Sequence, residues 1–107
     1  MCVRFVETPV FTRRVTDLLP DEDYRTLQIA LMLRPEQGPL IKGSGGLRKI
    51  RWAPKGAGKR GGVRLVYYWK PAEQVFYMLF AYAKTTQKDL TPDQLRVLAR
   101  IVREELK

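Results

Sequence analysis

The segment Val75–Ala83 restricts the possible folds of this chain more than any other part of the sequence, because nearly every residue in it is apolar. It is the longest apolar run in the chain, yet it is far shorter than the roughly 20 residues that span a bilayer. A short apolar run of this kind is typical of a strand that is covered on both faces. We therefore expect a globular domain with a central strand at residues 75–83 and no association with a membrane.

The length of the chain limits it to one domain. Its 107 residues, 45% of them hydrophobic, suffice for one compact core and are too few for two. Residues 1–11 lack the apolar stretch of a secretory signal, and a lone cysteine, Cys2, permits neither an internal disulfide nor a cysteine-based zinc site. We expect a single domain over residues 1–107 and a cytoplasmic location.

The remaining elements follow from changes in hydrophobic periodicity. Helix starts are indicated by Thr8-Pro9, by Pro20 with its following acidic residues, and by Thr91, which opens a T-x-x-Q capping box. The alternating patterns predict strands. The expected elements are a short edge strand at 1–6, helices from 9 and from 20 to 34, strands at 47–52, 63–69 and 75–83, and a helix from 91.

This order predicts an α+β fold. The first two helices, joined by a tight turn, form an N-terminal αα-hairpin. The last three strands form a small twisted antiparallel sheet, on which this hairpin and the C-terminal helix pack. We expect the helices to lie on one face of that sheet.

The positive charge of the chain has a definite location. The net charge is +9, and the segment Lys42–Lys70 holds nine of the 20 basic residues and no acidic residue. The rest of the chain is balanced. A solvated surface normally mixes both signs, so this segregation indicates a polyanionic partner.

The residue types that are absent exclude several kinds of chemistry. The chain has no histidine and only one serine, Ser44, so a serine–histidine hydrolase and imidazole metal ligands are excluded. The glycine-rich segments 43–46 and 56–62 lack the spacing of a nucleotide-binding loop. Catalysis would have to use Lys, Arg, Tyr, carboxylates or the backbone, and we expect no metal and no cofactor.

Four cations form the candidate catalytic site. Alternation places Lys49 and Arg51 on one face of their strand, Arg64 on the next strand can face the same way, and Lys84 follows the central strand directly. A site made only of cations suits RNA cleavage, in which the ribose 2′-OH attacks its own 3′-phosphate. The hypothesis assigns Lys49 as the general base, because crowding by like charges favours a neutral amine, and Arg64 as the clamp on the transition state. Arg51 and Lys84 would contact phosphate.

Other cations are predicted to bind RNA along its backbone, and the candidate catalytic cations have a purely structural alternative. The predicted RNA-binding residues are Arg48, Lys55, Lys59, Arg60 and Lys88. Lys49 and Arg51 could instead lie on the solvent-exposed face of an antiparallel sheet. Arg64 lies in an apolar strand, where a solvent-exposed charge is less expected. The aromatic residues of that strand and Trp52 are interpreted mainly as core residues.

The combination of these segments resembles the RelE superfamily of toxins. The resemblance is carried by residues 47–51, 62–68 and 80–84, and the segment 89–95 looks like the HigB-like branch. It implies a RelE-like fold and ribosome-dependent, metal-independent cleavage of messenger RNA in the decoding site. It also implies that Lys49, Arg51, Arg64 and Lys84 carry the reaction. The implied partners are the ribosome with its message and a cognate antitoxin, in this branch usually a helix-turn-helix DNA-binding protein.

The chain departs from the family pattern at two places, and other functions stay open. Many members have an arginine after the last lysine, where this chain has Thr85, and a tyrosine in the C-terminal segment, where this chain has none after Tyr82. Lys88 is a candidate for part of the proton transfer. The alternatives are a toxin of the same fold that poisons DNA gyrase, a non-catalytic RNA-binding module, and a structural protein with an incidental basic loop.

Overall fold

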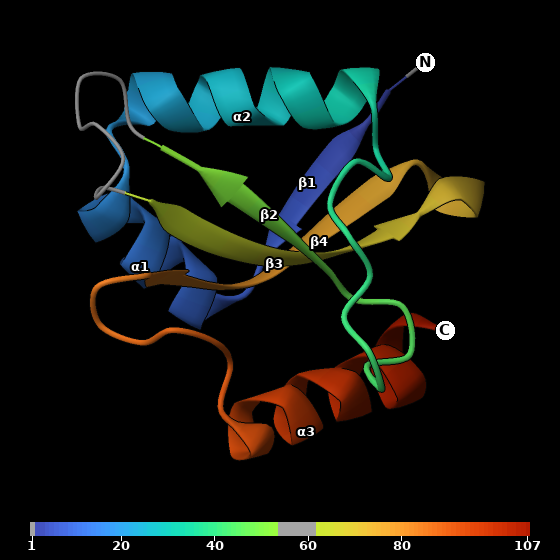
Figure 1. Cartoon of the computed structure of the whole chain (residues 1–107). Coiled ribbons are helices and arrows are strands. Elements are labelled where there is room, and N and C mark those ends of the chain that lie inside the picture. Colours follow the sequence, from blue (N-terminus) through green and yellow to red (C-terminus); the bar gives the residue numbers. More distant parts are fainter. Residues whose placement is uncertain (1, 54–61) are drawn as a thin grey trace.

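The computed structural model describes residues 2–53 and 62–107, and it confirms the predicted order of elements (Figure 1). The strands are β1 (Arg4–Glu7), β2 (Arg48–Trp52), β3 (Val63–Lys70) and β4 (Val75–Ala83). The helices are α1 (Pro9–Leu18), α2 (Asp21–Leu33) and α3 (Pro92–Ile101). Single helical turns follow β3 and α3, at Pro71–Glu73 and Val102–Leu106.

Two of the predicted helix starts are visible as side-chain caps. The Thr8 hydroxyl accepts a hydrogen bond from the Phe11 N–H at 3.1 Å, and Pro9 occupies the first turn of α1. At α3 both halves of the capping box are present, because Thr91 accepts from the Gln94 N–H and the Gln94 side chain accepts from the Thr91 N–H. These contacts satisfy backbone donors that have no partner within the helix.

The sheet has the strand order β1-β4-β3-β2, with the predicted central strand β4 inside it and β1 at an edge. The β2–β3 and β3–β4 pairs are antiparallel as predicted, but β1 runs parallel to β4, with Arg4 opposite Val75. The sheet is therefore mixed rather than wholly antiparallel. Parallel strands need a long connection, and here β1 and β4 are separated in the chain by both helices of the hairpin and by β2 and β3.

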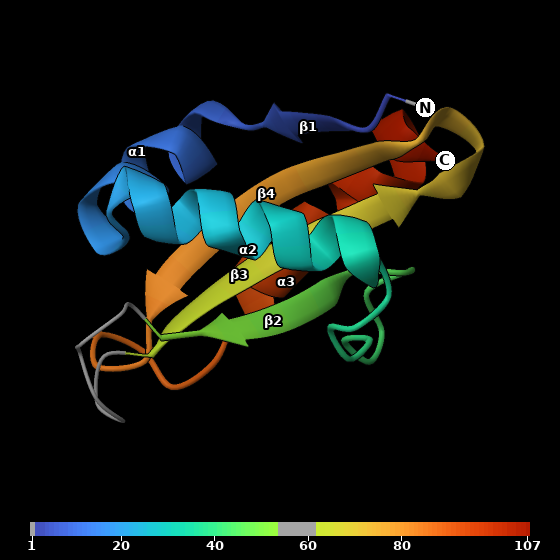
Figure 2. The ribbon, with the colours of Figure 1, turned by 90° about the horizontal axis from the view of Figure 1, so that it is seen from above.

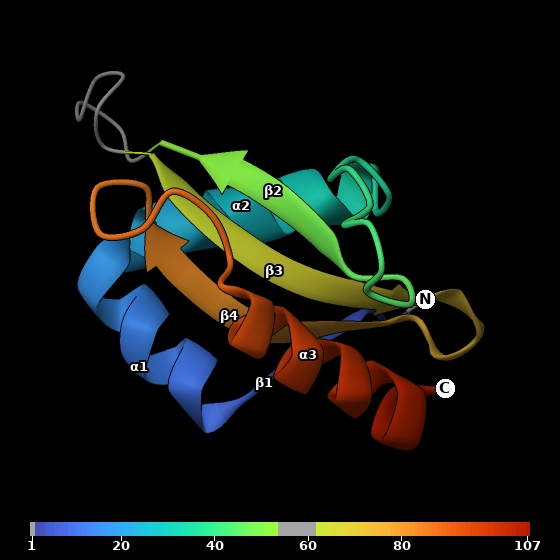
Figure 3. The same cartoon turned by 60° about the horizontal axis from the view of Figure 1, so that its bottom comes forward.

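Helices cover both faces of the sheet, which corrects the expectation of helices on one face. Figures 1 and 2 show α2 on one side, and Figure 3 shows α3 in front of the opposite side. The α2 side buries the apolar residues of the hairpin together with Ile50, Leu65, Tyr67 and Phe76. The α3 side buries a second set. Both sets are needed because the apolar strand β4 presents side chains to both faces.

A bulge in β4 sets which residues face α3. Val66 pairs with Phe80, whereas its neighbour Tyr67 pairs with Met78, so Leu79 is an extra residue on β4. Leu79 and Phe80 both join the core on the α3 side. The alternation that continues from Phe80 directs Tyr82 to that side as well.

The segment between α2 and β2 follows the outer edge of the sheet. The Lys49 N–H donates to the Pro39 carbonyl at 3.1 Å, and Leu40 forms a bridge with Arg48. This pairing occupies backbone groups that an edge strand would otherwise leave open. Across residues 2–53 and 62–107, no helix combines the length and the apolar composition that a bilayer crossing requires.

Candidate active site

The register of β2 and β3 places three of the predicted cations on the α3 side of the sheet. Arg51 lies directly opposite Arg64, and Lys49 lies opposite Val66. Residues directly opposite each other in an antiparallel pair point to the same face, as do residues two apart on one strand. The three side chains therefore share the face to which Val66 and Tyr82 belong. Arg51 is exposed, Lys49 is half-buried, and Arg64 is only 6% exposed.

A cleft of about 720 Å³ opens beside β2 on this face. Its walls come from the segment 37–42, from β2, and from the chain between β4 and α3 together with the first turns of that helix. Lys42, Lys49 and Arg51 contribute positive charge, and in the described part of the chain Asp89 is the only acidic residue that lines it. The cleft therefore suits an anionic ligand that follows β2.

Lys49 and Asp89 form an ion pair across this cleft. The Lys49 Nζ donates to the Asp89 Oδ1 at 2.9 Å, and the lysine side chain is 26% exposed against 69% for the aspartate. This hydrogen bond is the main reason why the pKa of Asp89 lies below its ordinary value. Lys49 is therefore not surrounded by like charges alone, because a carboxylate lies within hydrogen-bond distance of its amine.

Arg64 and Tyr82 are neighbours on adjacent strands and are both buried. They are register partners, and Tyr82 is fully buried. Among the described residues, no carboxylate lies within ion-pair distance of Arg64, and the Tyr82 hydroxyl has no hydrogen-bond partner. Burial raises the pKa of Tyr82, the charge of Asp89 raises it further, and Arg64 and Arg51 partly offset this rise. A buried hydroxyl without a hydrogen-bond partner is uncommon in protein interiors.

The backbone at Gly62 leaves room for the Arg64 side chain. A Cβ placed on Gly62 would lie 3.0 Å from the Arg64 Nη1. The Gly62 carbonyl also accepts a hydrogen bond from the Lys84 N–H at 3.1 Å. The start of β3 and the end of β4 are therefore joined next to the Arg64 side chain, and the predicted site residue Lys84 directly follows β4 at this end of the sheet. The side chains of Lys84 and Lys88 are exposed.

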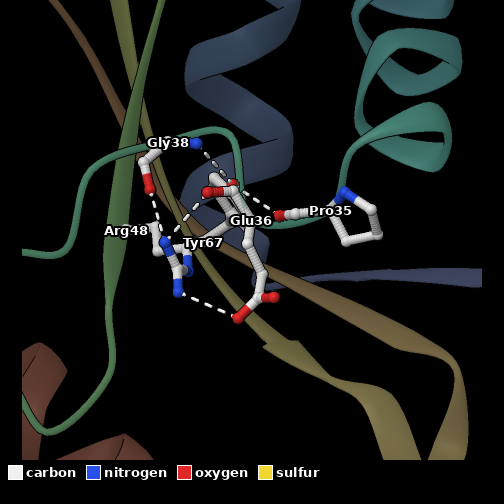
Figure 4. Close-up of polar contacts among 5 residues, drawn as sticks. All are labelled: Pro35, Glu36, Gly38, Arg48 and Tyr67. Carbon is white, nitrogen blue, oxygen red and sulfur yellow. Dashed lines mark hydrogen bonds and ion pairs between the residues drawn. The ribbon is translucent and has the colours of Figure 1, made fainter.

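Arg48 does not join the other cations, although it adjoins Lys49 in sequence. It lies opposite Tyr67, on the α2 side of the sheet. Figure 4 shows its guanidinium bound to the loop that follows α2: Nη1 donates to the carbonyls of Glu36 and Gly38 at 3.0 and 2.9 Å, and Nη2 pairs with the Glu36 carboxylate at 3.1 Å. The Tyr67 hydroxyl, also in Figure 4, donates to the Pro35 carbonyl at 2.7 Å.

The other predicted RNA-binding residues of the basic segment lie outside the described residues. These are Lys55, Lys59 and Arg60. The aromatic side chains that were interpreted as core are confirmed as such, with Trp52 and Trp69 packed on the α2 side and Tyr68 on the α3 side. Over residues 2–53 and 62–107, no three His, Cys, Asp or Glu side chains gather in a way that could hold a metal ion.

A second groove, of about 640 Å³, lies between α1, β4 and α3. Most of its walls are apolar, with Val10, Phe80 and Val97 among them. An apolar groove offers little to a polyanion, so the candidate site is the cleft beside β2 together with Arg64 and Tyr82, which do not line the cleft but lie next to Arg51 on the same face of the sheet.

Sequence reasoning missed two residues of the site, Tyr82 and Asp89. The position of Tyr82 depends on a bulge that the apolar pattern of β4 does not reveal. Asp89 follows β4 in an irregular segment, and only the return of the chain to α3 brings it to Lys49. For Tyr82 the available signal was a polar aromatic residue near the end of a buried strand. For Asp89 no local signal exists.

Comparison with known proteins identifies a family that the chain matches. Residues 34–107 match the model of a family described as the RelE toxin of the RelE/RelB toxin–antitoxin system. The fold is similar to that of an E. coli RelE toxin mutant in the free state, with a TM-score of 0.61, 13% identity, and coverage of 94% of this chain and 96% of that one. It is also similar to the RelE–RelB complex of Pyrococcus horikoshii OT3, with a TM-score of 0.52, 19% identity, and coverage of 78% and 97%.

Proposed function

Since the chain belongs to the RelE toxin family of toxin–antitoxin systems, we propose that it is a ribosome-dependent endoribonuclease that cleaves messenger RNA and thereby inhibits translation. The observation that carries this proposal is the position of Arg64. The residue is 6% exposed, its side chain faces the same way as those of Lys49 and Arg51, and it forms no ion pair among the described residues. A largely buried cation that forms no ion pair is stabilised when an anionic ligand binds beside it.

The proposed reaction needs only the groups of this site and of the RNA. The 2′-OH attacks the adjacent 3′-phosphate, the bond to the 5′ oxygen of the next nucleotide breaks, and a proton moves from the attacking to the leaving oxygen. Arg64 would hold two oxygens of the phosphorane through its planar fork. Arg51 and Lys84 would contact flanking phosphates. Lys49 would act as the general base only after its pair with Asp89 opens.

The remaining expectations belong to the same proposal. We place this chain in the HigB-like branch, with a helix-turn-helix antitoxin as its cognate partner, the decoding site of the ribosome as its place of action, and the cytoplasm as its location. Lys55, Lys59, Arg60 and Lys88 would contact the RNA backbone. Arg48 would contribute indirectly, because its guanidinium already binds the loop at Glu36 and Gly38.

The proposal is tested with programmed ribosomes and a defined message. Wild-type protein is expected to cut the message only when ribosomes are present, and Arg64→Ala is expected to lower the cleavage rate by about 10²- to 10³-fold, the usual effect of removing one group that stabilises a developing charge. Arg96→Ala is the matched control, because Arg96 is exposed on α3 and, among the described residues, pairs only with the nearby Asp93.

Two results would overturn the proposal. An intact message at saturating wild-type protein would exclude the nuclease. Equal losses of rate and of affinity in Arg64→Ala would indicate a binding module, since a catalytic group loses rate beyond its loss of affinity.

A further inference from the structure

Asp89 is the exception in a cleft whose other charged walls are cationic. Its Oδ1 accepts a hydrogen bond from the Lys49 Nζ at 2.9 Å. Among the described residues it is the single acidic residue that lines the cleft, facing Lys42, Lys49 and Arg51. A site for polyanions in which an aspartate carboxylate already binds one of the lysines requires an explanation.

The backbone around Asp89 is held in place by side chains. The Gln87 Nε2 donates to the Asp89 carbonyl at 2.8 Å and to the Gln94 Oε1 at 2.8 Å. Gln94 is itself half of the capping box that starts α3. The main chain at Asp89 is thus anchored to the helix end, so the folded chain directs this carboxylate to the cleft.

The carboxylate occupies the position that a phosphate oxygen would use. Ammonium groups bind carboxylate and phosphate oxygens at the same distances, about 2.7–2.9 Å, so the contact seen here is one that RNA would also make. The Asp89 side chain is 69% exposed and can turn away into solvent when a stronger anion arrives. The lysine hydrogen bond lowers the pKa of Asp89, which keeps it a carboxylate at neutral pH.

We propose that Asp89 is a specificity-determining residue of this cleft, whose carboxylate competes with RNA phosphate for Lys49. The inference rests on the proposed function in one respect, namely that the cleft binds RNA. Its consequence is selectivity. A ligand with a single phosphate would have to displace Asp89 for one contact, whereas a strand held at several cations displaces it at little additional cost.

The test compares charge removal at two nearby positions. Asp89→Asn removes the competing charge, and Asp93→Asn removes an equal charge that pairs with Arg96 outside the cleft. The probe is a fully 2′-O-methylated oligoribonucleotide, which lacks the attacking hydroxyl and can be bound but not cut. Its Kd is measured by fluorescence anisotropy at several salt concentrations, also for Lys49→Ala and for Lys49→Ala with Asp89→Asn.

Asp89→Asn is expected to bind the probe about two- to fivefold more tightly, the range that corresponds to opening one partly exposed ion pair. Its Kd should also depend more steeply on salt, because one more lysine charge is available to the RNA. Asp93→Asn should match wild type closely. In the Lys49→Ala background, Asp89→Asn should have no effect, because the lysine for which the carboxylate competes is gone.

The inference is overturned if Asp89→Asn and Asp93→Asn behave alike, or if the effect of Asp89→Asn persists without Lys49. Thermal melting confirms that the variants are folded, and Asp89→Ser replaces Asp89→Asn if the latter is not. The ribosome assay separates this inference from the proposed function. Tighter binding by Asp89→Asn without cleavage by wild type would refute the nuclease alone, whereas cleavage with unchanged binding would refute the competition alone.

Discussion

Tyr67 and Tyr82 are buried tyrosines on opposite faces of the sheet, and they differ in the hydrogen bonds of their hydroxyl groups. The Tyr67 hydroxyl donates to the Pro35 carbonyl and accepts from the Gly38 N–H at 3.1 Å. The Tyr82 hydroxyl has no partner among the described residues. Burial raises the pKa of both. The same side chain thus stabilises the fold at one position and is an energetic cost at the other.

This difference predicts opposite effects of the same substitution. Tyr67→Phe should lower the free energy of unfolding by about 1–3 kcal/mol, because it leaves buried backbone groups without partners. Tyr82→Phe should leave the free energy of unfolding unchanged or raise it by up to about 1 kcal/mol, because it removes an unsatisfied hydroxyl. Urea unfolding of the two variants and wild type measures both effects. A loss at Tyr82→Phe as large as that at Tyr67→Phe would show that its hydroxyl has a partner.

Gly62 offers a way to move Arg64 without removing it. A Cβ at Gly62 would come 3.0 Å from the Arg64 Nη1, and a flexible side-chain end can move away at little cost. Gly62→Ala should therefore keep the melting temperature nearly unchanged while lowering the rate of message cleavage by up to about 10-fold, because the clamping group has to shift by only part of an ångström. Unchanged cleavage would show that the position of the guanidinium is not critical to the reaction.

At the scale of elements, β2 has two different roles on its two faces. Arg48 binds the loop after α2 through three hydrogen bonds, whereas Lys49 faces the cleft. Arg48→Ala should therefore lower the free energy of unfolding by about 1–3 kcal/mol. Lys49→Ala should change stability by less than about 1 kcal/mol but abolish most cleavage. Urea unfolding and the ribosome assay are run on both variants, and a reversed pattern would contradict the assignment of the two faces.

The ion pair between Lys49 and Asp89 joins β2 to the segment before α3, and its contribution to stability depends on pH. The folded chain lowers the pKa of Asp89 below its value in the unfolded chain, so the unfolded state binds the proton more readily. The contribution is therefore complete at neutral pH and is lost as the pH falls below about 4 and through the lower pKa of the folded chain.

Asp89→Asn tests this dependence. Wild type should melt slightly higher than Asp89→Asn at pH 7, by the small amount expected of an exposed ion pair, and the two should converge toward pH 2. Melting temperatures recorded across this range provide the measurement. A difference that stays constant with pH would mean that the Asp89 carboxylate does not contribute through its charge.

At the scale of the whole molecule, periodicity predicted the element order because each helix or strand is specified by its own residues. The caps at Thr8 and Thr91 and the bounds of β4 needed nothing beyond local sequence. The parallel pairing of β1 and the placement of helices on both faces could not be found in this way, because they depend on which segments meet after long connections.

In the candidate site too, the relations that depend on local sequence were predicted, and those that depend on tertiary structure were not. Alternation along β2 and across its hairpin was enough to bring Lys49, Arg51 and Arg64 to one face, since that relation is local. Asp89 reaches Lys49 only through the tertiary path of the chain after β4. Arg48 was predicted as an RNA contact because it belongs to the basic segment, and neither composition nor alternation reveals that its side chain binds the loop after α2.

The location of the charge, rather than its total, should govern association with RNA. The segment Lys42–Lys70 has no acidic residue, whereas the rest of the chain is balanced. Replacing Lys55, Lys59 and Arg60 with serine removes three charges from this segment, and replacing Arg13, Arg25 and Arg100 removes three exposed charges from the balanced part. Stopped-flow measurements with labelled RNA at low salt should show association slowed about tenfold or more by the first set and little by the second, because steering follows the local field. Equal slowing by both sets would mean that net charge alone attracts the RNA.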